Sequence, residues 1–81
     1  MAKLHARGRK ELKRMSKEFP AEGGASAFVM TFAFFDDGVV LFKRAVRRDG
    51  RLDTSHWKVN SRGSVDRFER AQLVLADKGY T

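Results

Sequence analysis

The feature that most constrains the fold is a pair of turn signals between runs of strand-forming residues. Residues 27–35 are rich in Phe, Val, Met and Thr, and an Asp-Asp-Gly turn at 36–38 separates them from a second run at 39–48. A three-residue loop ending in Gly commonly combines a type I turn with a bulge, which places Phe32 opposite Phe42. The sequence therefore predicts an antiparallel hairpin over this stretch.

A second hairpin is predicted by the Asp-Gly pair at 49–50, which favours a two-residue primed turn and returns residues 52–59 along the second strand. Carrying both registers through the sheet places Trp57 opposite Phe42. Alternation then divides the meander into an apolar core face and a mixed face, with Phe35 as an exposed aromatic on the mixed one. The predicted core face holds Phe28, Met30, Phe32, Phe34, Val40, Phe42, Val46, Trp57 and Val59.

Helical patterns flank this meander. Apolar residues and one Gly recur at steps of three and four over residues 3–19, before Pro20. Ser64 is a suitable N-cap for a second helix that ends before Gly79. We therefore expect an α+β fold of order α-β-β-β-α in one domain, 1–81, with both helices packed on one face of the sheet. The expected elements are a basic helix at about 3–19, a three-stranded antiparallel meander at about 26–60 and a helix at about 64–78.

The predicted α-β-β-β-α order resembles that of double-stranded RNA-binding domains, whose two helices also cover one face of a sheet. That family carries a basic motif at the start of its second helix. The corresponding segment here, 64–68, reads Ser-Val-Asp-Arg-Phe and lacks the motif. The resemblance is one of topology, and no site residue is assigned from it.

Catalytic and metal chemistry find little support among the residues. The chain has no Cys, and its two His are too isolated for a structural zinc site. Ser55 and His56 are neighbours on a predicted strand, so alternation sends them to opposite faces and separates a nucleophile from its base. The turn at 36–38 lacks the further acidic ligands of a calcium loop. We expect a cytoplasmic protein that is not an enzyme and needs no cofactor or metal.

Charge points to the class of partner. Lys and Arg number 17 against 10 Asp and Glu, a formal net charge of +7, and a field of that sign favours polyanions such as DNA or RNA. One basic cluster lies in the N-terminal segment and another along the second strand to its hairpin tip, where guanidinium groups would enter solvent. The candidate binding residues are Lys3, Arg7, Arg9, Lys10, Lys13, Arg14, Lys17, Lys43, Arg47, Arg48, Arg51 and Lys58.

This positive charge also has simpler interpretations, which stay open. Cations keep a small protein soluble, and charged strands discourage pairing with other sheets. A membrane-surface helix is disfavoured because the apolar stripe is narrow, lacks Trp and is needed to cover the sheet. For function, the alternative is a protein-binding inhibitor or adaptor of the kind phages and plasmids encode, for example an anti-CRISPR-like protein, which docks on an acidic surface of a host protein. Either type would act as a monomer or homodimer.

Overall fold

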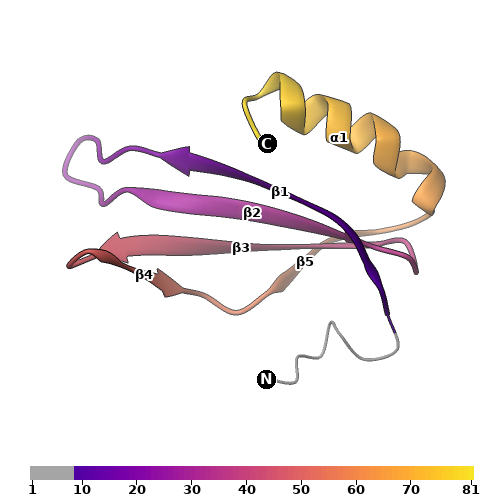
Figure 1. The fold of residues 1–81 in the computed structure, drawn as a ribbon, viewed down its shortest axis with the longest axis horizontal. Helices are drawn as coiled ribbons and strands as arrows, with labels where there is room; N and C mark the ends of the chain where they lie inside the picture. Colours follow the sequence, from indigo (N-terminus) through magenta and orange to yellow (C-terminus); the bar gives the residue numbers. More distant parts are fainter. Residues whose placement is uncertain (1–8) are drawn as a thin grey trace.

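The computed structural model describes residues 9–81, which form one antiparallel sheet with a single short helix beside it (Figure 1). Strands β1, β2 and β3 lie in sequence order, while β4 and β5 follow one another along the far side of β3. A 3₁₀ turn at Val65–Arg67 leads into the helix, α1 (Phe68–Asp77). The strands are β1 (Glu11–Phe19), β2 (Phe28–Phe35), β3 (Val39–Arg48), β4 (Arg51–Thr54) and β5 (Lys58–Arg62).

The expected α-β-β-β-α order with two helices and a three-stranded meander is therefore wrong. The described part of the segment predicted as a basic helix is strand β1, and residues 3–8 lie outside the described residues. Met15 and Phe19 are four residues apart, and a step of four returns to the same side in a helix and in a strand alike. Because residues 11–19 form strand β1 where the first helix was expected, the topological resemblance to double-stranded RNA-binding domains does not hold either.

Pairing with β2 explains why this segment is extended. Phe19 lies opposite Phe28, and the two rings stack with centroids 4.7 Å apart and planes 9° from parallel. Cross-strand aromatic contacts of this kind contribute up to about 1 kcal/mol each, which is comparable to the modest preference of Lys, Glu and Leu for helix. Tertiary contact thus overrides local propensity.

Both predicted hairpin turns are confirmed. Phe32 lies opposite Phe42, as the Asp-Asp-Gly turn predicts. At the second turn Arg48 pairs with Arg51, and positive φ angles of 50° at Asp49 and 80° at Gly50 are those of a type I′ turn. Local turn chemistry therefore sets the register of both hairpins where the strands leave the turn.

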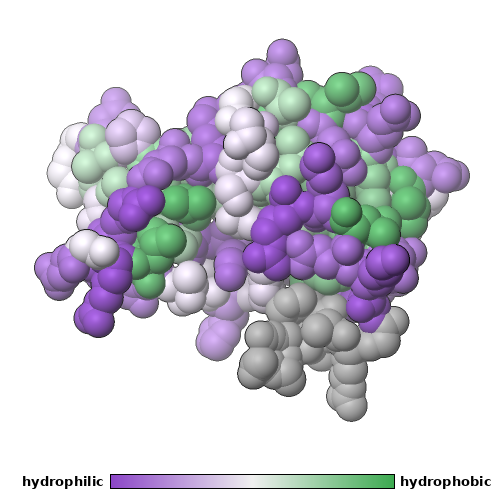
Figure 2. Space-filling view, viewed as in Figure 1, coloured by the Kyte–Doolittle hydropathy of each residue, from purple (hydrophilic) through white to green (hydrophobic). Residues whose placement is uncertain are grey.

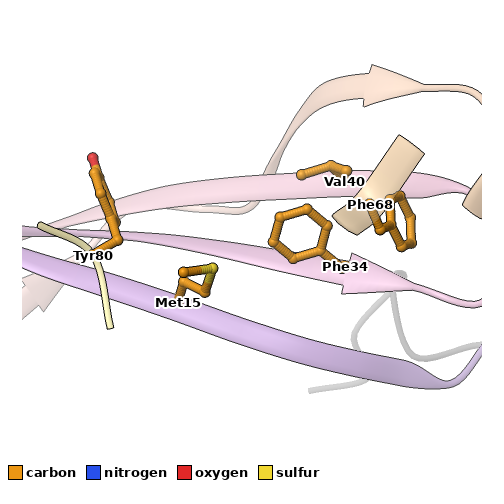
Figure 3. Close-up of a cluster of buried hydrophobic side chains, with 5 residues drawn as sticks. All are labelled: Met15, Phe34, Val40, Phe68 and Tyr80. Carbon is orange, nitrogen blue, oxygen red and sulfur yellow. The ribbon is translucent and has the colours of Figure 1, made fainter. Parts of the chain in front are cut away.

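The main core lies between the sheet and α1. Met15, Phe34 and Val40 come from three adjacent strands and meet Phe68 of α1 and Tyr80 of the C-terminal segment (Figure 3). The rings of Phe34 and Phe68 pack edge to face with centroids 5.0 Å apart, and Phe34 is fully buried. The Ser64 hydroxyl accepts a hydrogen bond from the Asp66 amide, so Ser64 caps the 3₁₀ turn that leads into α1, while α1 itself begins after Arg67 without a side-chain cap.

A second apolar cluster lies on the opposite face of the same sheet. It consists of Ala33, Phe35, Val39 and Leu41, with Trp57 packed against it. Phe35 is 1% exposed, so its expected exposure is wrong. The guanidinium carbon of Arg9 lies 6.0 Å from the centre of the Phe35 ring. Strands β2 and β3 are thus apolar on both faces, and α1 covers one of them.

Gly38 provides a sharp test of the loop between β2 and β3. Its φ is +87°, and a Cβ atom there would lie 2.1 Å from the Gly63 carbonyl oxygen, whereas Gly24 has the same φ and open space around it. Gly24→Ala should therefore cost only the strain of a left-handed residue, about 1–2 kcal/mol. Gly38→Ala should cost clearly more in urea denaturation, because backbone must also move. Equal losses of stability in the two variants would contradict the packing of this loop against Gly63.

Tyr80, the chain's single tyrosine, gives a test in alkaline solution. Burial raises the pKa of its phenol above the ordinary value of about 10, because the charged form loses hydration. A group with a raised folded pKa stabilises the fold below pH 10, and this contribution is lost as pH rises through the folded value. Absorbance at 295 nm should titrate above pH 10 in native protein and return to the ordinary value in urea. A native midpoint at or below 10 would contradict the burial of Tyr80.

Candidate nucleic-acid interface

A β-bulge between β4 and β5 turns the chain's single tryptophan away from α1. The Ser55 amide donates to the Arg44 carbonyl at 3.0 Å, and the Arg44 amide donates to the Ser55 hydroxyl at 3.1 Å. The next registered pair is Lys58 with Phe42. Residues 56–57 therefore face a single residue of β3, and a two-against-one arrangement of this kind re-aims side chains.

The predicted pairing of Trp57 with Phe42 is wrong for this reason. One extra residue shifts the register by one, and a shift of one moves each side chain to the other face. Trp57 consequently packs on the cluster that includes Ala33 and Leu41, and Val59 lies opposite Leu41 instead of joining the core under α1. We call this side of the sheet, opposite α1, the Trp57 face.

Two cations converge on the tryptophan ring. The guanidinium carbon of Arg14, from β1, lies 5.4 Å from the ring centre, and the ammonium nitrogen of Lys43, from β3, lies 4.7 Å from it. Both distances are within the range of cation–π attraction. We call Arg14, Lys43 and Trp57 the Trp57 cluster. Its ring is half-buried and its arginine is exposed.

One carboxylate accompanies these two cations. Arg14 donates to both oxygens of Glu11, from Nε at 2.8 Å and from Nη2 at 2.7 Å. This hydrogen-bonded pair raises the pKa of Arg14, although burial opposes the shift. Lys43 forms no ion pair with any residue in 9–81. The Trp57 cluster with Glu11 therefore carries a net positive charge.

The same face continues away from Trp57 with paired polar groups. The hydroxyls of Ser16 and Thr31 lie 2.9 Å apart on neighbouring strands. Beyond them Arg47 makes a two-point ion pair with Glu18, and hydrogen bonding from this arginine lowers the pKa of the Glu18 carboxyl. A guanidinium engaged in this way has fewer donors left for a phosphate.

The predicted basic tip between β3 and β4 exists, but its charge is partly neutralised. Nε of Arg48 lies 3.2 Å from Oδ2 of Asp53, and Arg51 is exposed beside it. Hydrophilic residues surround a small apolar patch at this end of the molecule (Figure 2). A hollow of about 290 Å³ at the tip is lined by Arg48, Asp49, Arg51, Leu52 and Asp53.

The remaining predicted cations do not join the Trp57 cluster. Lys3 and Arg7 lie outside the described residues. Arg9 forms an ion pair with Asp37 at 2.8 Å. Lys17 donates to the Lys78 carbonyl at 2.6 Å, below the end of α1. Lys10 is exposed just before β1, and Lys13 is exposed on β1. Lys58 is exposed on β5 opposite Phe42.

Within residues 9–81, no group of three or more histidines or acidic residues is placed to hold a metal ion. Across the same residues, no helix has both the length and the apolar character needed to cross a bilayer. What the described surface offers is a set of cations around an aromatic ring.

Comparison with known proteins adds no relative. The chain matches no family model, no curated protein and no solved structure.

Fluorescence quenching tests the charge at the Trp57 cluster without any ligand. Iodide should quench the single tryptophan more effectively than caesium at equal low ionic strength, because Arg14 and Lys43 attract anions to the ring. Replacing both cations with Gln should reduce the ratio of iodide to caesium quenching. A wild-type ratio no higher than that of the double variant would contradict the positive charge of this site.

Proposed function

We propose that this protein binds nucleic acid through the Trp57 face, with Arg14 and Lys43 contacting backbone phosphates. The observation that carries the proposal is the convergence of two cations, from strands on either side of β2, on one aromatic ring. Bringing like charges together costs electrostatic free energy, which Glu11 offsets at Arg14 and which a further anion would offset at Lys43. Phosphate is the anion that repeats along a polymer and suits a chain with net charge +7.

This proposal moves the centre of binding relative to the sequence-based expectation. The sequence placed the main phosphate contacts on an N-terminal helix, whereas the proposal places them on one face of strands β1 and β3. The hairpin tip has a smaller part because residues 47–53 include no aromatic ring. Its Arg47 and Arg48 are paired with Glu18 and Asp53, as Arg14 is with Glu11. Contacts to phosphates carry no sequence information, so we expect binding with little sequence preference.

A salt titration with matched variants tests the proposal. Fluorescence anisotropy would measure the binding of labelled DNA and RNA over a series of salt concentrations. The series would start at about 50 mM, where non-specific affinity is strongest. The double substitution Arg14→Gln and Lys43→Gln should weaken binding and reduce the salt slope by about 1.4–1.8, because it removes two phosphate-binding cations. The control is Arg70→Gln with Lys78→Gln, which removes the same charge from exposed positions at α1.

The control variant should keep the wild-type slope within error. Equal loss of affinity in both double variants would assign binding to net charge alone and contradict a localised site. Absence of any association with DNA or RNA at about 50 mM salt, the permissive condition for non-specific binding, would overturn the proposal itself.

A second candidate function is a protein-binding inhibitor or adaptor, and an exposed apolar group favours it. Leu73 is 66% exposed and Val74 47% exposed on α1, with Arg70 and Asp77 nearby on the same helix. Apolar side chains ringed by charge are typical of protein contact sites. A pull-down with and without nuclease separates the two functions: a protein retained after nuclease, and lost on Leu73→Asp, would favour the inhibitor.

A further inference from the structure

We infer that the Trp57 face selects single-stranded nucleic acid, with one base stacked at Trp57. This inference rests on the proposed function and names its substrate class. An aromatic ring offers a base its π face, and such stacking contributes about 1–3 kcal/mol per base with little dependence on sequence. The Trp57 cluster combines a ring with cations, which are the two elements of sites that track single strands.

The first support is the way the fold holds this ring. An unbulged strand would place Trp57 opposite Phe42, on the face of the sheet that carries α1. The bulge at 56–57 instead directs the largest side chain of the chain to the face opposite the helix. There it packs against the second apolar cluster, whose members are all 5% exposed or less. Because packed apolar side chains already hold the indole ring, the ring loses little conformational freedom when a ligand stacks on it.

The second support is that two cations accompany the ring, and Arg14 would exchange its hydrogen bonds to Glu11 for a phosphate. Arg14 is exposed, and the ends of arginine and lysine side chains can move to a phosphate while their stems stay in place. A guanidinium can also stack on a base itself. A base at Trp57 would then take over the ring contact, and Arg14 and Lys43 would turn to the phosphates on either side of it.

A duplex fits this surface less well. Bases within a duplex are stacked on both sides, so an aromatic ring on a sheet face has no base surface to contact. Reading a groove instead requires a helix or β-ribbon that enters it. The β3–β4 ribbon is the element of that shape, but its tip holds no member of the Trp57 cluster. Arg47 and Arg48 there pair with Glu18 and Asp53, as Arg14 pairs with Glu11. The geometry therefore favours single strands over duplexes.

The test compares one nucleic-acid sequence as a single strand and as a duplex. A protein variant then removes the Trp57 ring without changing the charge. Labelled single-stranded DNA of about 15 nucleotides, its RNA equivalent and the matching duplex would be titrated by anisotropy at fixed salt. Trp57 emission would be followed in the same titrations. We expect single strands to bind more tightly than the duplex and to quench Trp57. Trp57→Leu should weaken single-strand binding about 5- to 150-fold and leave the salt slope unchanged, since both phosphate-binding cations remain.

Trp57→Phe keeps an aromatic ring and should retain most of the affinity, which separates stacking from a general loss of packing. Melting of each variant would confirm that it is folded at the assay temperature. Equal binding of duplex and single strand, or unquenched Trp57 at saturation with single strand, would overturn the inference. Such results would leave phosphate binding by Arg14 and Lys43 standing, whereas absence of all binding would overturn both.

Discussion

The structure depends on one constraint: β2 and β3 carry apolar side chains on both faces. Phe34 and Val40 lie on one side, and Phe35 and Leu41 lie on the other, all at or below 5% exposure. A single ten-residue helix covers only one face. The other face must bury its cluster with what the strands themselves provide. This 81-residue chain therefore has two apolar clusters, one on each face of its sheet, and only one of them lies under a helix.

The bulge before β5 is how the chain meets that requirement. It packs Trp57 against the second apolar cluster, where the indole contributes apolar cover on the face opposite α1. The charged ends of Arg14 and Lys43 converge on the same ring, which places two cations beside an apolar cluster. A structural need thus produces a cationic aromatic surface. The proposed function is a use of that surface.

Local chemistry made part of this fold predictable. The two hairpin turns and the pairing of Phe32 with Phe42 depend on a few adjacent residues, and each was predicted correctly. Strand β1 was missed because Met15 and Phe19 stand four apart, a spacing that helix and strand share. Pairing to β2 decides between them, and such pairing is not local. Apolar residues at 12, 15 and 19 do not follow a period of two, so this segment carried no alternation that would have indicated a strand.

The candidate site was predictable in composition but not in geometry. Arg14 and Lys43 were among the cations singled out, yet nothing local indicated that they meet on one ring. Trp57 was assigned to the wrong face because the bulge has no turn signal; residues 55–58 read Ser-His-Trp-Lys without Gly or Pro. The position of Trp57 is explained by the second apolar cluster, which needs an apolar side chain to shield it from water. Ion pairs of Arg47 and Arg48 likewise depend on acidic residues of other strands or strand ends.

The position of Trp57 is the central claim, and nuclear Overhauser effects from its indole protons test it most directly. The bulge predicts contacts from the indole to the Leu41 methyl groups, the Ala33 methyl group and the side chain of Arg14. Contacts from the indole to the rings of Phe42 and Phe68 would place the tryptophan under α1. That result would contradict the bulge, and with it the Trp57 cluster.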